Sequence, residues 1–181
     1  MRDKFFIVVA LAGLAAALAP ALAGEDYGIG RPATSEEIAG WNIDVAPDGT
    51  GLPPGHGGVQ QGAEIFAEKC AVCHGDHGQG KPMDALAGGA GTIATPKPVK
   101  TVGSYWPYAT TLYDFIHRAM PFNAPQSLSS DEVYAVSAYV LFLNHLVPAD
   151  ADLDANTLPK VAMPNRGAFV SAFTPAQGNA P

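Results

Sequence analysis

The sequence of 181 residues has little cysteine, a shortage of positive charge and no internal repeat. It carries 10 basic residues against 17 acidic ones, for a formal net charge of −7. Because phosphate recognition depends on basic patches, this balance excludes a nucleic-acid partner and favours one with a basic docking face. The lack of a repeat excludes solenoid and propeller architectures. A chain of this length suits one domain with extensions.

Long apolar runs are also scarce, and the one that exists lies at the N-terminus. Two positive charges in residues 1–4 precede the apolar residues 5–18, and Ala21-Leu22-Ala23 follows. This is the order of a secretory signal peptide, which predicts cleavage after Ala23 and a periplasmic protein. A membrane anchor would need about 20 apolar residues, so no membrane span is expected after cleavage. Residues 24–181 then hold 8 basic and 16 acidic residues, a formal net charge of −8.

Three further segments follow the signal peptide. Residues 24–57 form an arm rich in Gly, Pro and Asp, with one short helix that starts from a capping box of Thr34 and Glu37 and stops at Gly40. Residues 58–147 contain the periodic apolar patterns and are predicted to form an all-α domain. Residues 148–181 are predicted to be an irregular, proline-bearing tail.

Within the predicted domain, apolar periodicity indicates helices at 58–70 and 111–119 and a third helix after residue 129. Ser129 and Glu132 form the capping box of the third helix. The stretch 75–107 is too long for an unsupported loop in a compact domain, unless it packs on a bound group.

Both cysteines belong to the motif Cys70-Ala71-Val72-Cys73-His74. Two thiols at this spacing can add to the two vinyl groups of a haem, and the next histidine then ligates the iron. The motif therefore predicts one covalent haem c held by Cys70 and Cys73, with His74 as an iron ligand. A redox dithiol would need a thioredoxin-like context, and a zinc site with His77 would be crowded.

The second iron ligand must come from elsewhere in the chain. Met120 is favoured, because it ends a helix and precedes Pro121, and Met163 is the main alternative. His117 is interpreted as a surface histidine. A carbonyl in residues 80–82 is expected to orient His74, while Tyr105 and Trp106 are expected to pack on the haem. The other candidate ligands are Met83, His56, His77 and His145.

The order of these motifs resembles a class I cytochrome c over residues 58–147. The carriers of the resemblance are Gly62, Phe66 and the cysteine motif. In that family an aromatic residue of the last helix packs against the first helix, and Tyr139 has that position here. The resemblance implies a class I cytochrome c fold, with helices around one haem.

A narrower resemblance covers nearly the whole chain after residue 23. Segments 27–31, 41–45, 102–112, 118–122 and 163–166 resemble the cytochrome subunit of sulfane dehydrogenase, although this chain has one haem motif where that family has two. The resemblance implies a periplasmic, non-enzymatic electron carrier in sulfur and thiosulfate oxidation. Its implied electron donor is a molybdenum-cofactor dehydrogenase subunit, and its acceptor a further cytochrome or oxidase.

An alternative function to the electron carrier stays open. A haem peroxidase or gas-binding cytochrome would need a displaceable sixth ligand on the iron.

The role of the arm and the tail is a separate question. They are hypothesised to dock the chain onto its molybdenum partner, and the alternative is that they wrap and stabilise the haem domain.

Overall fold

The computed structural model describes residues 28–170, which fall into two compact units that adjoin between Trp41 and Asn42. The signal peptide predicted for residues 1–23 lies outside the described residues. In the first unit, helix α2 spans Ser35–Trp41 and buries none of its residues. The predicted capping box is present, since Thr34 Oγ1 accepts from the Glu37 amide at 3.2 Å and Glu37 accepts from the Thr34 amide at 2.9 Å. The helix continues one residue past Gly40, where the sequence predicted its end.

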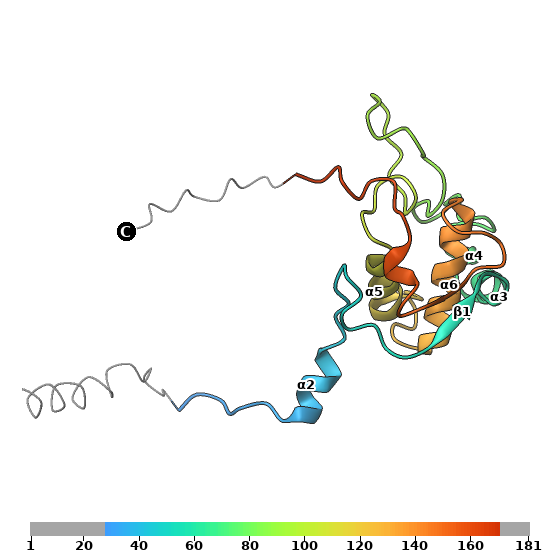
Figure 1. Cartoon of the computed structure of the whole chain (residues 1–181). Helices are drawn as coiled ribbons and strands as arrows, with labels where there is room; N and C mark the ends of the chain where they lie inside the picture. The colour runs from blue at the N-terminus through green and yellow to red at the C-terminus, as the bar shows by residue number, and fades with distance from the viewer. Residues whose placement is uncertain (1–27, 171–181) are drawn as a thin grey trace, which may run out of the picture. The chain divides into compact units, whose positions relative to one another are not determined.

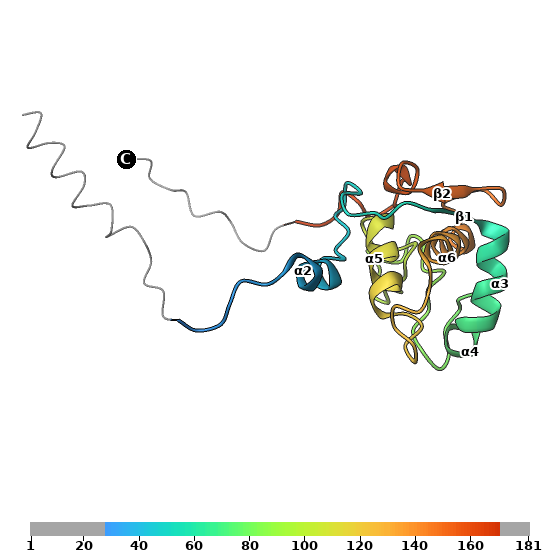
Figure 2. The same ribbon diagram turned by 90° about the horizontal axis from the view of Figure 1, so that it is seen from below.

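The second unit is built around helix α6, Ser130–Leu143, which lies between helices α3, Val59–Lys69, and α5, Ala109–Ala119 (Figure 1, Figure 2). A one-turn helix, α4, follows α3 at Ala71–His74. These helices confirm the predicted all-α class I cytochrome c architecture, and the Ser129–Glu132 capping box that starts α6 is fully formed. The most deeply buried part of the core comes from α6, whose Tyr134, Ala138 and Leu141 are inaccessible to solvent.

Helix α3 crosses α6 at a glycine. A Cβ atom on Gly62 would collide with the carbonyl of Ala135 and would lie 2.9 Å from the Cβ of Tyr139. One turn along α3, the rings of Phe66 and Tyr139 are in contact, with centroids 5.2 Å apart. The pairing expected of Tyr139 with the Gly62 and Phe66 region is therefore confirmed. The contact depends on the missing side chain of Gly62, because that is what lets the two backbones approach.

Replacing Gly62 by alanine should lower the free energy of unfolding by about 1–3 kcal/mol, the range typical of overpacked interiors, because neither backbone can yield without moving a helix. Chemical denaturation of the purified protein measures this change. Gly40→Ala in α2 is the matched control, since its Cβ would meet no atom within 4 Å. Equal stability of the two variants would contradict the close crossing.

The segments just before α3 and after α6 pair in a small sheet that was not predicted from the sequence. Strand β1, His56–Gly58, pairs antiparallel with β2, Asp152–Asp154, with Gly57 opposite Leu153. Each strand has three residues and one of them is rich in glycine, so neither has an alternating apolar pattern long enough to detect. A short 3-10 helix, η2, follows at Leu158–Lys160.

Much of the arm and tail packs into this unit. From the tail, four apolar side chains belong to the core: Leu153, Leu158, Val161 and Met163. From the arm, the Val45 amide donates to Asp114 at 3.0 Å, and the Pro53 carbonyl accepts from the Tyr134 hydroxyl at 2.9 Å. The structure thus favours stabilisation of the domain over partner docking as the role of residues 42–57 and 151–165.

Among the helices of residues 28–170, none combines the length and the apolar character that crossing a membrane requires.

Candidate haem-binding site

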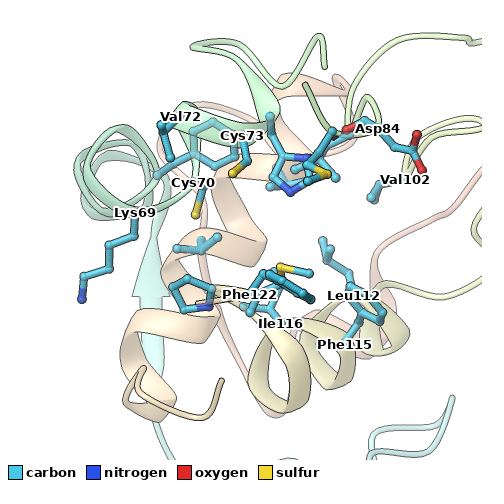
Figure 3. A pocket seen from close by; sticks show the side chains of 18 of the residues that line it. Lys69, Cys70, Val72, Cys73, Asp84, Val102, Leu112, Phe115, Ile116 and Phe122 are labelled. Atoms are coloured by element: carbon cyan, nitrogen blue, oxygen red, sulfur yellow. Dashed lines mark hydrogen bonds between the residues drawn. The ribbon is translucent and has the colours of Figure 1, made fainter. Parts of the chain in front are cut away.

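A cavity of about 910 Å³ opens between the turn of the cysteine motif and helices α5 and α6. Most of its lining is apolar. Figure 3 shows Cys70 and Cys73 on one side of the cavity and Leu112 and Ile116 of α5 on the other. His74 and Met120 also line the cavity. The fold thus brings all four predicted haem-attachment and iron-ligand residues to one apolar space.

Local backbone geometry places the first three of these residues together. Helix α3 ends at Lys69, and the carbonyl of Cys70 accepts from the amides of Cys73 at 3.1 Å and His74 at 3.0 Å. This tight turn lets both thiols and the imidazole reach one cavity. The five-residue motif is therefore a single structural element.

The environment of Cys70 does not suit a reactive dithiol. Burial among apolar side chains raises the pKa of the Cys70 thiol to about 11, because a thiolate there would lose its hydration. Redox-active thiols have the opposite shift, toward a stabilised thiolate. A neutral thiol facing an apolar cavity agrees with attachment of an apolar macrocycle.

One backbone carbonyl orients His74. Its Nδ1 lies 2.9 Å from the carbonyl oxygen of Asp84. A carbonyl can only accept, so Nδ1 donates and Nε2 keeps the lone pair that a metal needs. The prediction of an acceptor within residues 80–82 is wrong by two residues. There the Gly80 amide donates instead to the His74 carbonyl at 2.7 Å, and that bond folds the loop back so that Asp84 reaches the ring.

Met120 lies at the C-cap of α5, where the backbone becomes extended and its amide still donates to the Ile116 carbonyl at 3.0 Å. The residue therefore leaves the helix at the cavity. Met163, the alternative ligand, is a buried core residue that does not line the cavity. Met83 does line it, but its amide donates to the Cys73 carbonyl at 3.0 Å, which places its backbone beside the cysteine motif.

His117, expected from the sequence to lie on the surface, is only partly exposed. Its Nδ1 is buried with no hydrogen-bond partner in the described residues, and its ring centroid lies 5.9 Å from that of Tyr113. Tyr113 is four residues earlier in α5, so the two side chains share one face of the helix. His117 does not line the cavity.

The two aromatic residues predicted to pack on a haem separate in the structure. Trp106 lines the cavity and makes an edge contact with Phe115, at 5.8 Å between ring centroids. Tyr105 does not line the cavity; its ring contacts Phe169 instead. Val102 and Phe122 also line the cavity, and no sequence signal pointed to them, because both lie in irregular segments without a periodic pattern.

The donor set and the cavity fit a covalently bound haem. Two thiols can form thioethers, an imidazole nitrogen and a thioether sulfur are ligands that haem iron takes, and the remaining lining is mainly apolar. These features define a centre of the c type.

Comparison with known proteins leads to the same class. Residues 59–144 match the family described as Cytochrome c. The chain is also 42% identical to a chain in the crystal structure of the sulfane dehydrogenase SoxCD from Paracoccus pantotrophus, with a TM-score of 0.77, over 86% of this chain and 83% of that one. The chain belongs to the cytochrome c family, whose members bind haem c covalently.

Two curated relatives are named thiosulfate dehydrogenase. The one from Stutzerimonas stutzeri (strain A1501) is 31% identical over 133 residues, which is 72% of this chain and 40% of the relative. The one from Psychrobacter arcticus is 32% identical over 117 residues, which is 61% of this chain and 35% of the relative. The chain thus spans about 40% and 35% of the lengths of these relatives.

Proposed function

We propose that the protein is a periplasmic electron carrier with one haem c, which accepts electrons from a molybdenum-containing sulfane or sulfite dehydrogenase subunit. The observation that carries the proposal is the convergence of Cys70, Cys73, His74 and Met120 on one apolar cavity. When bound there, the haem supplies an iron that cycles between two oxidation states by one electron.

Each of these residues has a distinct task in this proposal. Cys70 and Cys73 hold the macrocycle through thioethers, and His74 and Met120 ligate the iron. The Asp84 carbonyl fixes the imidazole tautomer through the 2.9 Å hydrogen bond. Apolar side chains of α5 and α6 exclude water from the same space; they include Leu112, Ile116, Val136 and Val140.

A carrier is favoured over a peroxidase or a gas-binding cytochrome because His74 and Met120 both line the cavity and could both serve as iron ligands. An iron held by both residues would have no open position for a substrate. The chain is then not the catalyst of sulfur oxidation. Both cysteines of this chain are used for haem attachment in this proposal, so no thiolate remains to bind a second metal. The catalytic metal therefore belongs to the partner.

The sulfur substrate class rests on the relatives. One solved relative is a sulfane dehydrogenase and two curated relatives are thiosulfate dehydrogenases. The structural match to the sulfane dehydrogenase chain extends over 86% of this chain and 83% of that one, whereas the thiosulfate dehydrogenases are covered to 40% and 35%, so the sulfane dehydrogenase is the better guide to the partner. The proposed export to the periplasm rests on the signal-peptide pattern of residues 1–23. The proposed electron acceptor is a further cytochrome or an oxidase.

Three measurements on the purified protein test this proposal. The mass should show one haem adduct, and carbon monoxide should leave the spectrum of the reduced protein unchanged, because the iron is closed. The haem should be reduced by a sulfur substrate only when the molybdenum dehydrogenase subunit is present. Two adducts, a carbon monoxide shift, or reduction by thiosulfate without the partner would each overturn the corresponding part.

A further inference from the structure

Two segments that are distant in the sequence, residues 97–108 and 160–170, lie side by side in the second unit. The Asn165 side-chain amide donates to the Tyr105 carbonyl at 2.6 Å, and the rings of Tyr105 and Phe169 are 5.3 Å apart. The Arg166 guanidinium lies 5.4 Å from the ring of Tyr108. In Figure 1 the C-terminal segment, drawn in red, runs back past the loop that leads into α5.

These segments concentrate positive charge on an acidic protein. They contain four of the eight basic residues of positions 24–181 and no acidic residue: Lys97, Lys100, Lys160 and Arg166. Lys69 and Arg118 form ion pairs with carboxylates elsewhere in the unit. Within residues 28–170, neither Lys100 nor Arg166 has a carboxylate partner; Lys100 instead lies 4.8 Å from the Tyr105 ring. Both charges are therefore available to another molecule.

The same residues have the composition of a protein interface and adjoin the haem cavity. Arg166 and Lys100 are exposed, and Phe169 is 51% exposed. Arginine and aromatic residues are enriched at the centres of interfaces, where they carry much of the binding energy. Lys100 and Trp106 also line the cavity, so this surface is continuous with the site of electron exchange.

We propose that the cationic aromatic patch formed by Lys100, Tyr105, Tyr108, Arg166 and Phe169 docks the electron-donating dehydrogenase subunit through carboxylates on that subunit. This inference rests on the proposed function for the identity of the donor. The formal charge of −8 of residues 24–181 would by itself favour a partner with a basic docking face, whereas the patch favours a partner with an acidic one. However, charges further apart than about 10 Å are largely screened at 0.1 M salt, so the local sign decides which surfaces can meet.

The patch can be probed without the partner, using hexacyanochromate(III), a paramagnetic trianion that broadens amide signals where it binds. In the oxidised holoprotein at 0.1 M salt, we expect selective broadening at Lys100, Tyr105 and Arg166. Arg166→Gln should abolish this broadening. Lys160→Gln is the matched control, because it removes the same charge at η2, outside the patch, and it should leave the broadening in place. Equal loss in both variants would mean a net-charge effect and would overturn the inference.

Affinity for the molybdenum dehydrogenase subunit is the second readout. At 0.1 M salt, Arg166→Gln should raise the dissociation constant by about fivefold or more, which is the effect of an important interface residue. Lys160→Gln should leave the dissociation constant unchanged. An unchanged constant for Arg166→Gln, with normal electron acceptance, would overturn the docking surface and leave the proposed function intact. A protein that takes no electrons from the dehydrogenase while the trianion still binds the patch would overturn the donor, both here and in the proposed function.

Discussion

Replacing Met120 by alanine should open the haem iron and lower its reduction potential by on the order of 0.1–0.3 V, a fraction of the roughly 0.8 V range that axial ligands set. A thioether ligand raises the potential, and alanine has no atom that could replace it. The near-infrared charge-transfer band from sulfur to iron should disappear, and the reduced variant should bind carbon monoxide. Voltammetry and absorption spectroscopy measure these changes.

Two other methionines provide controls for Met120. Met83 lines the same cavity beside the cysteine motif, and Met163 is buried in the core away from the cavity. Met83→Ala should keep both the band and the potential. Met163→Ala should keep the band but lower stability by about 2–5 kcal/mol, because it leaves a cavity in the core. Loss of the band in Met163→Ala with retention in Met120→Ala would show that the ligand assignment is wrong.

Ending the chain at Val147 should destabilise the protein by on the order of 5 kcal/mol or more, a large part of the ~5–15 kcal/mol that a domain has. The truncation removes strand β2 and four buried apolar side chains of the tail. Each such side chain contributes about 1.5–3 kcal/mol on burial, less the entropy of ordering the chain that carries it. The expected result is a collapse of the melting temperature, measured by circular dichroism with the haem attached.

A shorter truncation separates packing from chain length. Ending the chain at Gly167 keeps Leu158, Met163 and the Asn165 hydrogen bond to Tyr105, so its stability should stay close to that of the full chain. Leu158→Ala should cost about 2–5 kcal/mol by itself, since Leu158 is completely buried. If the chain ending at Val147 melted normally and lost only affinity for the dehydrogenase subunit, the tail would be a docking segment after all.

The sequence alone was sufficient to predict those features whose signal comes from residues close together in the chain. The spacing of Cys70, Cys73 and His74 predicts haem attachment because one helical turn sets the distance between the thiols. The capping boxes at Thr34 and Ser129 fix two helix starts, since donor and acceptor are three residues apart. The periodic apolar residues of α3, α5 and α6 were likewise sufficient to predict the fold class.

Tertiary structure decided what depends on distant parts of the chain. Only the fold shows that Met120 leaves α5 at the cavity while Met163 turns into the core, although both precede a proline. Only the path of the loop selects the Asp84 carbonyl for His74, and only the closure of β1 on β2 makes the tail part of the domain. The patch of Lys100 and Arg166 likewise joins segments about sixty residues apart. Such contacts leave no periodic pattern in the sequence, because long-range packing forms them and local backbone preference does not.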